Sequence, residues 1–354
     1  MRLTKEAAEE KYQLEWCAWE ITKRCNMNCD ICLCGGPQSR EDELTTEEAL
    51  ELCKELMDMG VKRVVLTGGE PLMRADWEVI AGSLTDAGVD VWIATNGTLI
   101  QEETVEKMKA AGVGRVTISI DGTEKIHDGI RAEGSFAKCR NAAELLLCAG
   151  IPVYAATTVT AENFNDLQEL QLQLYDMKIK DWVIQLGLPY GNFVANDVKM
   201  LPPDKIKDLI DFCFSAVQEI PDMRIYPGDT IGYYTEKEIL VRKHALGTDK
   251  IPVFAGCPAG ISSLAIAADG DILTISMCVD RFIAGNIRET PLREIWEDDE
   301  NAAWKWRRGL KKKNLKGACR ECPYAEICLE GCPAVRYAMT GDVMGENKMC
   351  AFLD

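Results

Sequence analysis

Three cysteines near the N-terminus have the residue type and spacing of an iron-binding site. Cys25, Cys29 and Cys32 fall within eight residues in a C-x3-C-x2-C pattern. Thiolates are soft ligands that select iron–sulfur clusters, zinc or copper(I). Three thiolates can hold three irons of a cubane cluster, which leaves one iron open to bind a substrate or cofactor directly. The alternatives are a zinc site and a group of unrelated buried thiols.

A glycine pair and a carboxylate follow the next predicted strand. Gly68 and Gly69 allow the backbone to approach a ligand closely, and Glu70, which precedes Pro71, can accept hydrogen bonds from a cationic amine. By itself, this segment is equally consistent with a tight turn at the exit of a strand.

Together, the cysteine triplet and segment 68–71 resemble the signature of the radical S-adenosylmethionine (radical SAM) enzymes. In that family the three cysteines hold a 4Fe–4S cluster whose open iron chelates the amino and carboxylate groups of SAM. One electron then cleaves SAM to methionine and a 5′-deoxyadenosyl radical. The resemblance implies that segment 68–71 holds the SAM amino group. The family usually has an aromatic residue before the third cysteine, where this chain has Ile31.

The same resemblance assigns further SAM contacts to the ends of later predicted strands. It places the SAM carboxylate next to Ser119 and Arg131, and an arginine fork suits a carboxylate on chemical grounds as well. Asn96 lies where it could reach a ribose hydroxyl, and Thr158 and Gln185 lie where the family contacts ribose and adenine. For each residue the alternative is turn chemistry or a surface ion pair.

A second group of cysteines lies in the last hundred residues. Its C-x2-C-x5-C-x3-C block and the cysteine that follows resemble the SPASM extension of many radical SAM proteins, and segment 268–271 resembles a turn of that module. The resemblance implies one complete auxiliary 4Fe–4S site and a second site with three thiolates. The first set is Cys319, Cys322, Cys328 and Cys350, and the second is Cys257, Cys278 and Cys332.

The second auxiliary site departs from the family pattern. The family usually places its cysteine at the position of Ile275, whereas the nearest cysteine here is Cys278. The second site therefore has three ligands, uses another ligand such as Asp280, or is absent. Asp280 is also the candidate catalytic base, which would take a proton as the substrate radical is oxidised; the alternative is a solvated loop aspartate. For the whole block the alternative is a structural zinc module, because C-x2-C pairs also bind zinc.

Alternating strand and helix patterns predict the scaffold that brings these residues together. The alternation implies an α/β protein with a parallel sheet and right-handed crossovers. Six β/α units predict a partial (β/α)6 TIM-like barrel, whose chemistry lies at the C-terminal ends of the strands. The predicted strands are 16–22, 63–67, 90–95, 115–120, 152–159 and 181–186, and the main helices between them are 77–87, 102–111, 136–149 and 164–177.

The chain divides into four predicted segments. Residues 1–14 form an N-terminal extension, 15–200 the partial barrel, 201–253 a bridge, and 254–354 the Cys-rich auxiliary-cluster domain. In the bridge, Tyr233 and Tyr234 either line the substrate cavity or simply pack. His127 is interpreted as a structural hydrogen-bonding residue.

Composition excludes several classes of function. The formal net charge of −17 argues against a nucleic acid as substrate. No apolar run approaches the length of a membrane span, and the N-terminus lacks the apolar core of a signal peptide. We therefore expect a cytoplasmic protein without a membrane partner. In that compartment sixteen cysteines indicate metal or redox chemistry rather than disulfides.

Three functions are compatible with the sequence. The first is a radical SAM oxidoreductase that modifies a ribosomally synthesised peptide or a protein side chain, with auxiliary clusters for electron transfer. The second is the same chemistry on a small molecule, as in tetrapyrrole or cofactor biosynthesis. The third, a non-catalytic iron–sulfur carrier, has no need of segment 68–71 or Arg131.

Two kinds of protein partner are also predicted. No peptide-recognition domain is apparent before the barrel, so a separate protein would supply one for a peptide substrate. The basic run 305–316 is either a solvated helix face or a docking patch for an acidic electron donor, such as a flavodoxin-like protein or a ferredoxin.

Overall fold

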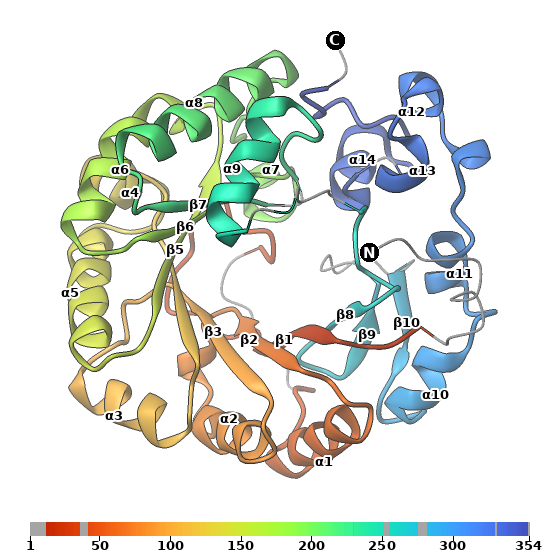
Figure 1. Cartoon of the computed structure of the whole chain (residues 1–354). Coiled ribbons are helices and arrows are strands. Elements are labelled where there is room, and N and C mark those ends of the chain that lie inside the picture. Colours follow the sequence, from red (N-terminus) through yellow and green to blue (C-terminus); the bar gives the residue numbers. More distant parts are fainter. Residues whose placement is uncertain are drawn as a thin grey trace.

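The structure is a computed structural model that describes residues 12–35, 42–228, 230–248, 250, 255–274, 282–329 and 331–352. Its strands are β1 (Trp16–Thr22), β2 (Arg63–Gly68), β3 (Asp90–Thr95), β4 (Arg115–Ser119), β5 (Val153–Val159), β6 (Asp181–Leu186), β7 (Arg224–Pro227), β8 (Ser263–Ile266), β9 (Asp271–Leu273) and β10 (Ile283–Asn286). They form one sheet in the order β10-β9-β8-β1-β2-β3-β4-β5-β6-β7 (Figure 1). The pairs from β8 through β1 to β7 are parallel, and β8–β9 and β9–β10 are antiparallel.

The predicted α/β partial barrel is confirmed. All six predicted strands are present, and each has bounds within one residue of those expected. The sequence did not indicate β7, which pairs in parallel with β6. The parallel sheet therefore continues into region 201–253, which was predicted to be a bridge.

Helices cover the outer face of this curved sheet (Figure 1). Those of the barrel are α1 (Thr46–Asp58), α2 (Trp77–Asp86), α3 (Glu102–Ala110), α4 (Glu124–Ile130), α5 (Ser135–Cys148), α6 (Leu167–Asp176), α7 (Asn192–Ala195), α8 (Ile206–Glu219) and α9 (Glu236–Leu246). Those of the Cys-rich part are α10 (Leu292–Glu297), α11 (Ala302–Arg308), α12 (Gly317–Glu321), α13 (Ala325–Cys328) and α14 (Pro333–Thr340).

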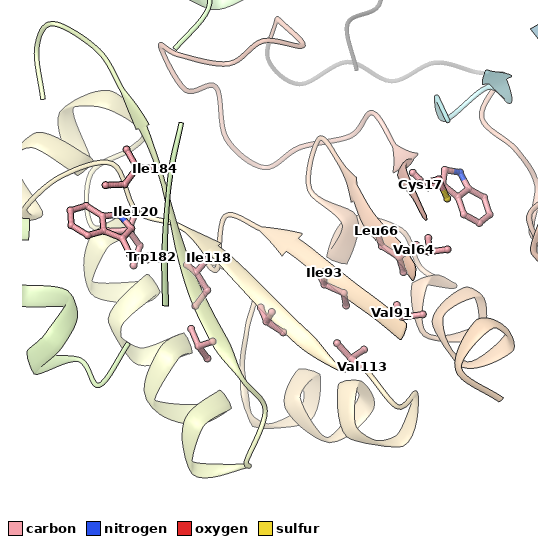
Figure 2. Packing of buried hydrophobic residues seen from close by; sticks show 14 of the residues in the cluster. Cys17, Val64, Leu66, Val91, Ile93, Val113, Ile118, Ile120, Trp182 and Ile184 are labelled. Atoms are coloured by element: carbon pink, nitrogen blue, oxygen red, sulfur yellow. The ribbon is translucent and has the colours of Figure 1, made fainter. Parts of the chain in front are cut away.

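The two faces of the sheet differ in burial because side chains alternate along each strand. Residues such as Leu66 on β2, Ile93 on β3 and Ile118 on β4 are almost fully buried against the helices (Figure 2). Burying one such side chain stabilises the fold by about 1.5–3 kcal/mol. The intervening residues face the inside of the barrel, and most of them are half-exposed. Solvent-sized molecules can therefore reach the inner face.

The helix after the cysteine loop, α1, begins with a capping box. The Thr45 hydroxyl accepts a hydrogen bond from the Glu48 amide, and the Glu48 carboxylate accepts one from the Thr45 amide. Arg288, which follows β10, binds the same carboxylate at 2.6 and 2.8 Å. The Arg288 hydrogen bonds lower the pKa of Glu48 to about 2. This ion pair ties α1 to the Cys-rich part of the chain.

The Cys-rich part joins the barrel through the sheet itself. Strand β8 pairs with β1 in parallel, so the 267–270 turn after β8 lies near the loop that leaves β1. The Lys23 ammonium lies 3.9 Å from the Asp269 carboxylate in that turn. The two parts therefore share one continuous scaffold. Among the described residues, none of the helices has both the length and the apolar composition needed to cross a membrane.

Candidate active site

The cysteine loop leaves the C-terminal end of β1 and packs against the glycine pair at the end of β2. A Cβ added at Gly68 would lie 2.1 Å from the Thr22 carbonyl oxygen, and one at Gly69 would lie 2.2 Å from the Arg24 carbonyl oxygen. The Gly69 and Glu70 amides donate hydrogen bonds to these two carbonyls, at 2.8 and 2.7 Å. The glycines are thus required for close approach to the chain that leads into Cys25.

The far side of the loop is held by α7, which sequence reasoning missed. The Asn192 side-chain amide donates to the Cys29 carbonyl (2.9 Å) and the Asn28 side chain (2.8 Å), and its backbone amide donates to the Cys32 carbonyl (2.9 Å). At the preceding Gly191, an added Cβ would lie 2.6 Å from that last carbonyl oxygen. The signal in the sequence was a Gly-Asn pair just beyond the sixth strand.

The three thiols of the loop are half-exposed and lie between these two supports. Burial raises the pKa of Cys29 to about 11, although the nearby Arg131 guanidinium opposes the shift. Burial also raises the pKa of Cys25. Metal binding deprotonates such thiols. The donor set, three soft ligands on one short loop, fits an iron–sulfur cluster with one open iron.

Glu70 is fully buried where the short helix Pro71–Met73 begins. Its carboxylate accepts hydrogen bonds from the Thr95 hydroxyl (2.7 Å), the Asn96 amide (2.8 Å) and the Leu72 amide (3.2 Å). Burial raises the pKa of Glu70 to about 6, although these hydrogen bonds oppose the shift. A carboxylate has about four acceptor positions. Within the described chain these bonds use three, so one position is available to an amine.

Asn96 lies at the end of β3 and contacts the cysteine loop. Its side-chain amide donates to Asn26 at 2.9 Å, and its side-chain oxygen accepts from the Thr98 amide and hydroxyl at 2.9 and 2.6 Å. Asn26 directly follows Cys25 and also donates to the Thr98 hydroxyl at 2.8 Å. The side chain predicted to reach a ribose therefore also orders the start of the loop.

Arg131 follows α4 and has a buried carboxylate partner. Its Nε donates to Asp121, which is fully buried, and its Nη1 lies 3.9 Å from the Cys29 Sγ. The other oxygen of Asp121 accepts from the Thr158 amide at 2.7 Å. Burial lowers the pKa of Arg131, but the Asp121 carboxylate and the Cys29 thiol raise it by more. The guanidinium therefore stays charged, and its Nη end is directed toward the cysteine loop.

The remaining predicted SAM contacts lie at the same end of the barrel. Ser119 ends β4 and is half-exposed. Thr158 and Gln185 are register partners on β5 and β6, and the Gln185 amide donates to the Thr158 hydroxyl at 3.2 Å. The structure thus brings the predicted SAM residues to one edge of the sheet. His127 is buried, and its Nδ1 accepts from the Asp121 amide at 3.1 Å, as expected of a structural residue.

A second group of thiols lines a pocket in the Cys-rich part. Among the described residues, no three Cys, His, Asp or Glu side chains converge on a point that would hold a single ion. Four thiols around one pocket are the donor set of a 4Fe–4S cluster. The thiols are Cys319, Cys322, Cys328 and Cys350, and the other lining residues are Tyr233, Tyr234, Ala325, Asn347 and Phe352.

The second predicted auxiliary site is described only in part. Cys278 and Asp280 lie outside the described residues. Cys332 is buried next to this pocket, and its amide donates to the Tyr233 hydroxyl at 3.3 Å. The Cys257 carbonyl accepts a hydrogen bond from the Arg307 Nε at 3.1 Å. The two bridge tyrosines thus belong to the surroundings of the auxiliary cysteines.

The basic run 305–316 is not a uniform charged face. Arg307 is buried, and the Arg308 guanidinium carbon lies 4.8 Å from the Trp296 ring centroid. Lys316 pairs with Asp342 at 2.8 Å. Three consecutive lysines of this run, residues 311–313, are exposed. Any docking patch for an electron donor is therefore smaller than the sequence suggested.

The inner face of the barrel carries a stack of cationic and aromatic side chains. The Arg63 and Arg115 guanidinium carbons lie 3.8 and 3.5 Å from the Trp92 ring centroid, and Arg115 lies 3.7 Å from that of Tyr154. The next inward positions on the neighbouring strands have small side chains that are half-exposed, which leaves room above the stack. These residues are Ala18, Val65, Thr117, Ala156 and Val183.

Comparisons with known proteins agree with this arrangement. Residues 19–174 match the family model of the radical SAM superfamily, and residues 257–323 match that of an iron–sulfur cluster-binding domain, SPASM. The chain is 33% identical over 347 residues to the AdoMet-dependent heme synthase of Methanosarcina barkeri, and the match covers 95% of each chain. It is 27% identical over 342 residues to the mycofactocin maturase MftC of Mycolicibacterium smegmatis, covering 94% of this chain and 81% of that one.

A solved structure shows the same fold. SuiB of Streptococcus suis, bound to S-adenosylmethionine, superposes with a TM-score of 0.76 at 17% identity. The superposition covers 96% of this chain and 78% of SuiB.

Proposed function

Because this chain belongs to the radical SAM superfamily and carries a SPASM iron–sulfur domain, we propose that it is an oxidoreductase that modifies a carboxylate-bearing tetrapyrrole. The observation that carries the substrate class is the 33% identity to a heme synthase over 95% of both chains. The two domains imply a 4Fe–4S cluster, SAM and auxiliary iron–sulfur clusters.

Cys25, Cys29 and Cys32 hold the SAM-binding cluster in this proposal. When bound, the cluster and SAM supply a 5′-deoxyadenosyl radical that abstracts hydrogen from an unactivated carbon. Glu70 takes the SAM amino group at its remaining acceptor position, and Arg131 takes the carboxylate with the Nη groups that Asp121 leaves available. Glu70 is buried, the Arg131 side chain is 11% exposed, and both are held by fixed partners, so they orient SAM without rearrangement.

The other proposed contacts complete the SAM pocket. Ser119 joins Arg131 in binding the SAM carboxylate in this proposal, and Asn96 contacts the ribose. Thr158 and Gln185 lie at the ends of adjacent strands and bind the ribose and adenine. Gly68 and Gly69 pack against the cysteine loop. This contact fixes the distance between the thiols of the loop and Glu70, the next residue.

The auxiliary clusters are assigned to the Cys-rich part. The proposed ligands of the complete cluster line the pocket of the Cys-rich part, and those of the second are Cys257, Cys278 and Cys332. Asp280 is proposed as the catalytic base or as a further ligand of that second site. A flavodoxin-like protein or a ferredoxin supplies electrons, and residues 311–313 are where an acidic donor would dock.

A tetrapyrrole is preferred over the peptide that the sequence put first. The heme synthase is more similar to this chain than the mycofactocin maturase is, and the match covers more of the relative. The inner face of the barrel also suits an anionic molecule, because it carries guanidinium groups with small side chains at the next inward positions. These guanidinium groups support binding by charge.

Peptide modification is the second candidate, supported by the similarity to the mycofactocin maturase. A peptide substrate would need a recognition protein as a partner. One assay separates the two candidates. Reduced, reconstituted enzyme is incubated with SAM and either an iron porphyrin with propionate side chains or a candidate precursor peptide. Formation of 5′-deoxyadenosine together with a mass change of the porphyrin supports tetrapyrrole modification. If only the peptide stimulates 5′-deoxyadenosine formation and only the peptide changes in mass, peptide modification is supported.

A further inference from the structure

We propose that Arg115 is the anchor for a substrate carboxylate on the inner face of the barrel. This inference rests on the proposed function, because it names the side chain that recognises the anionic rim of the tetrapyrrole. Arg115 begins β4, and Ser119, a proposed SAM contact, ends the same strand.

The guanidinium of Arg115 is stacked on both faces. Its carbon lies 3.5 Å from the ring centroid of Trp92 on β3 and 3.7 Å from that of Tyr154 on β5. The N–H donors of a guanidinium lie in its plane and point outward from its edge. Stacking between two rings therefore covers the faces and leaves the edge available. This is the geometry in which an arginine can bind a carboxylate with two parallel hydrogen bonds.

Arg115 has no internal partner for these donors within the described part of the chain. No hydrogen bond or ion pair to a described residue engages its guanidinium, whereas both neighbouring arginines are paired. Arg63 binds Asp90 at 3.1 Å, and Arg224 binds Asp181 at 2.5 Å. The second oxygen of Asp181 accepts from the Tyr226 hydroxyl at 2.9 Å.

The charge balance favours an anion at this position. The five ionic groups just described comprise three arginines and two aspartates, so this cluster carries one positive charge in a chain with a net charge of −17. Burial and the neighbouring Arg63 lower the pKa of Arg115 by more than the nearby Asp181 carboxylate raises it, so the compensation of its charge within the chain is incomplete. A carboxylate from outside the chain would supply that compensation.

The position of Arg115 also sets the size of the substrate. Ser119 is four residues further along the strand, so the two inward positions are about 13 Å apart. A molecule bound to Arg115 must span this distance to bring a carbon near SAM. A macrocycle with carboxylates on its rim can do so, whereas a free amino acid cannot. The small side chains of Thr117 and Ala156 leave space for it between the two ends.

The test compares binding of an acid and its ester. Reconstituted enzyme is titrated with haem, which has two propionates, and with haem dimethyl ester, and binding is followed by porphyrin absorbance. For the wild type we expect haem to bind at least about tenfold more tightly than the ester, because a paired carboxylate is worth at least that much. Arg115→Gln should lower haem affinity to that of the ester and leave ester affinity unchanged. Arg115→Lys should keep part of the preference for haem over its dimethyl ester.

Arg140→Gln is the matched control, since Arg140 pairs with Asp176 on the outer helices at 3.1 Å and should not affect binding. An unchanged acid-over-ester preference in Arg115→Gln would overturn the anchor while the tetrapyrrole proposal stands. Equal weakening of both ligands would also overturn it, because that is the signature of a structural role. If the wild type binds neither ligand, the tetrapyrrole proposal fails and the anchor fails with it.

Discussion

The side-chain amide of Asn192 donates a 2.9 Å hydrogen bond to the carbonyl oxygen of Cys29, and this bond joins the cysteine loop to the element that follows the sixth strand. The loop is therefore supported from two directions, by Gly68 and Gly69 at one end and by Asn192 at the other. Because each support is a backbone contact or a short hydrogen bond, the three thiols are positioned before any ligand binds.

Replacing Asn192 with alanine should loosen the cysteine loop. The variant loses two side-chain hydrogen bonds, each with a net value of about 0.5–1.5 kcal/mol. We expect a lower iron content at the SAM cluster and a slower rate of 5′-deoxyadenosine formation. The control is Asn141→Ala, because Asn141 is an exposed residue of α5. Equal iron content in the two variants would contradict this role for Asn192.

Arg131→Gln should weaken SAM binding. Removing one partner of a buried charge pair costs about 2–5 kcal/mol, because the opposite charge is left unpaired. Here the variant leaves Asp121 buried without its partner and removes the proposed donor to the SAM carboxylate. The measurement is SAM affinity of the reconstituted protein, with Arg140→Gln as the control. An unchanged affinity would remove Arg131 from the SAM site.

The stability of the fold should depend on pH through His127. Burial lowers the pKa of His127 to about 4, below its value of about 6.5 in the unfolded chain. The unfolded state therefore binds the proton first. The stability that neutral His127 contributes to the folded state is complete above about pH 6.5. It is lost as the pH falls toward 4, by about 1.4 kcal/mol per pH unit within that window.

Thermal unfolding between about pH 7.5 and pH 5.5 measures this dependence. His127→Asn retains an acceptor for the Asp121 amide but removes the titrating ring, so its stability should change less with pH than that of the wild type. The control is His244→Asn, since His244 is the other histidine of the chain. If wild type and His127→Asn show the same pH dependence, the assignment of a neutral, buried His127 is wrong.

Iron content tests the number of clusters. Three cubanes hold about twelve irons, so the reconstituted wild type should contain about twelve, with matching sulfide. Replacing Cys25, Cys29 and Cys32 with alanine should abolish SAM cleavage and leave about eight irons in the Cys-rich part. Cys148→Ala, at an exposed thiol of α5, should change neither.

Other metal contents of the triple alanine variant would contradict different parts of the account. About four irons would correspond to one auxiliary cluster. That result would contradict a second cluster at Cys257, Cys278 and Cys332. Zinc without sulfide would contradict the iron–sulfur assignment of the Cys-rich part.

The sequence predicted those features that depend on local patterns. Short β-branched runs that alternate with helical patterns located six strands, and the cysteine spacings identified both domains. Strand β7 was missed because it is four residues long and contains an arginine and a proline, which are weak strand signals. Helix α4 was missed because its seven residues include Gly129.

Contacts between distant segments could not be read from the sequence. Asn192 reaches Cys29 only because the sheet brings the ends of β1 and β6 to one edge. Likewise, the stack of Arg115 on Trp92 and Tyr154 depends on the register of three strands. The assignment of Tyr233 and Tyr234 was left open because packing and cavity lining give the same pattern of aromatic residues; they line the cavity of the auxiliary cysteines.

Transfer of a hydrogen isotope from substrate to SAM product tests the central claim most directly. The enzyme is reduced in the presence of SAM and an iron porphyrin that is deuterated on its propionate side chains, and the 5′-deoxyadenosine formed is analysed by mass spectrometry. We expect the radical to abstract hydrogen from a propionate side chain, so the 5′-deoxyadenosine should be heavier by one deuterium. If 5′-deoxyadenosine forms without deuterium and the porphyrin is unchanged, the tetrapyrrole is not the substrate.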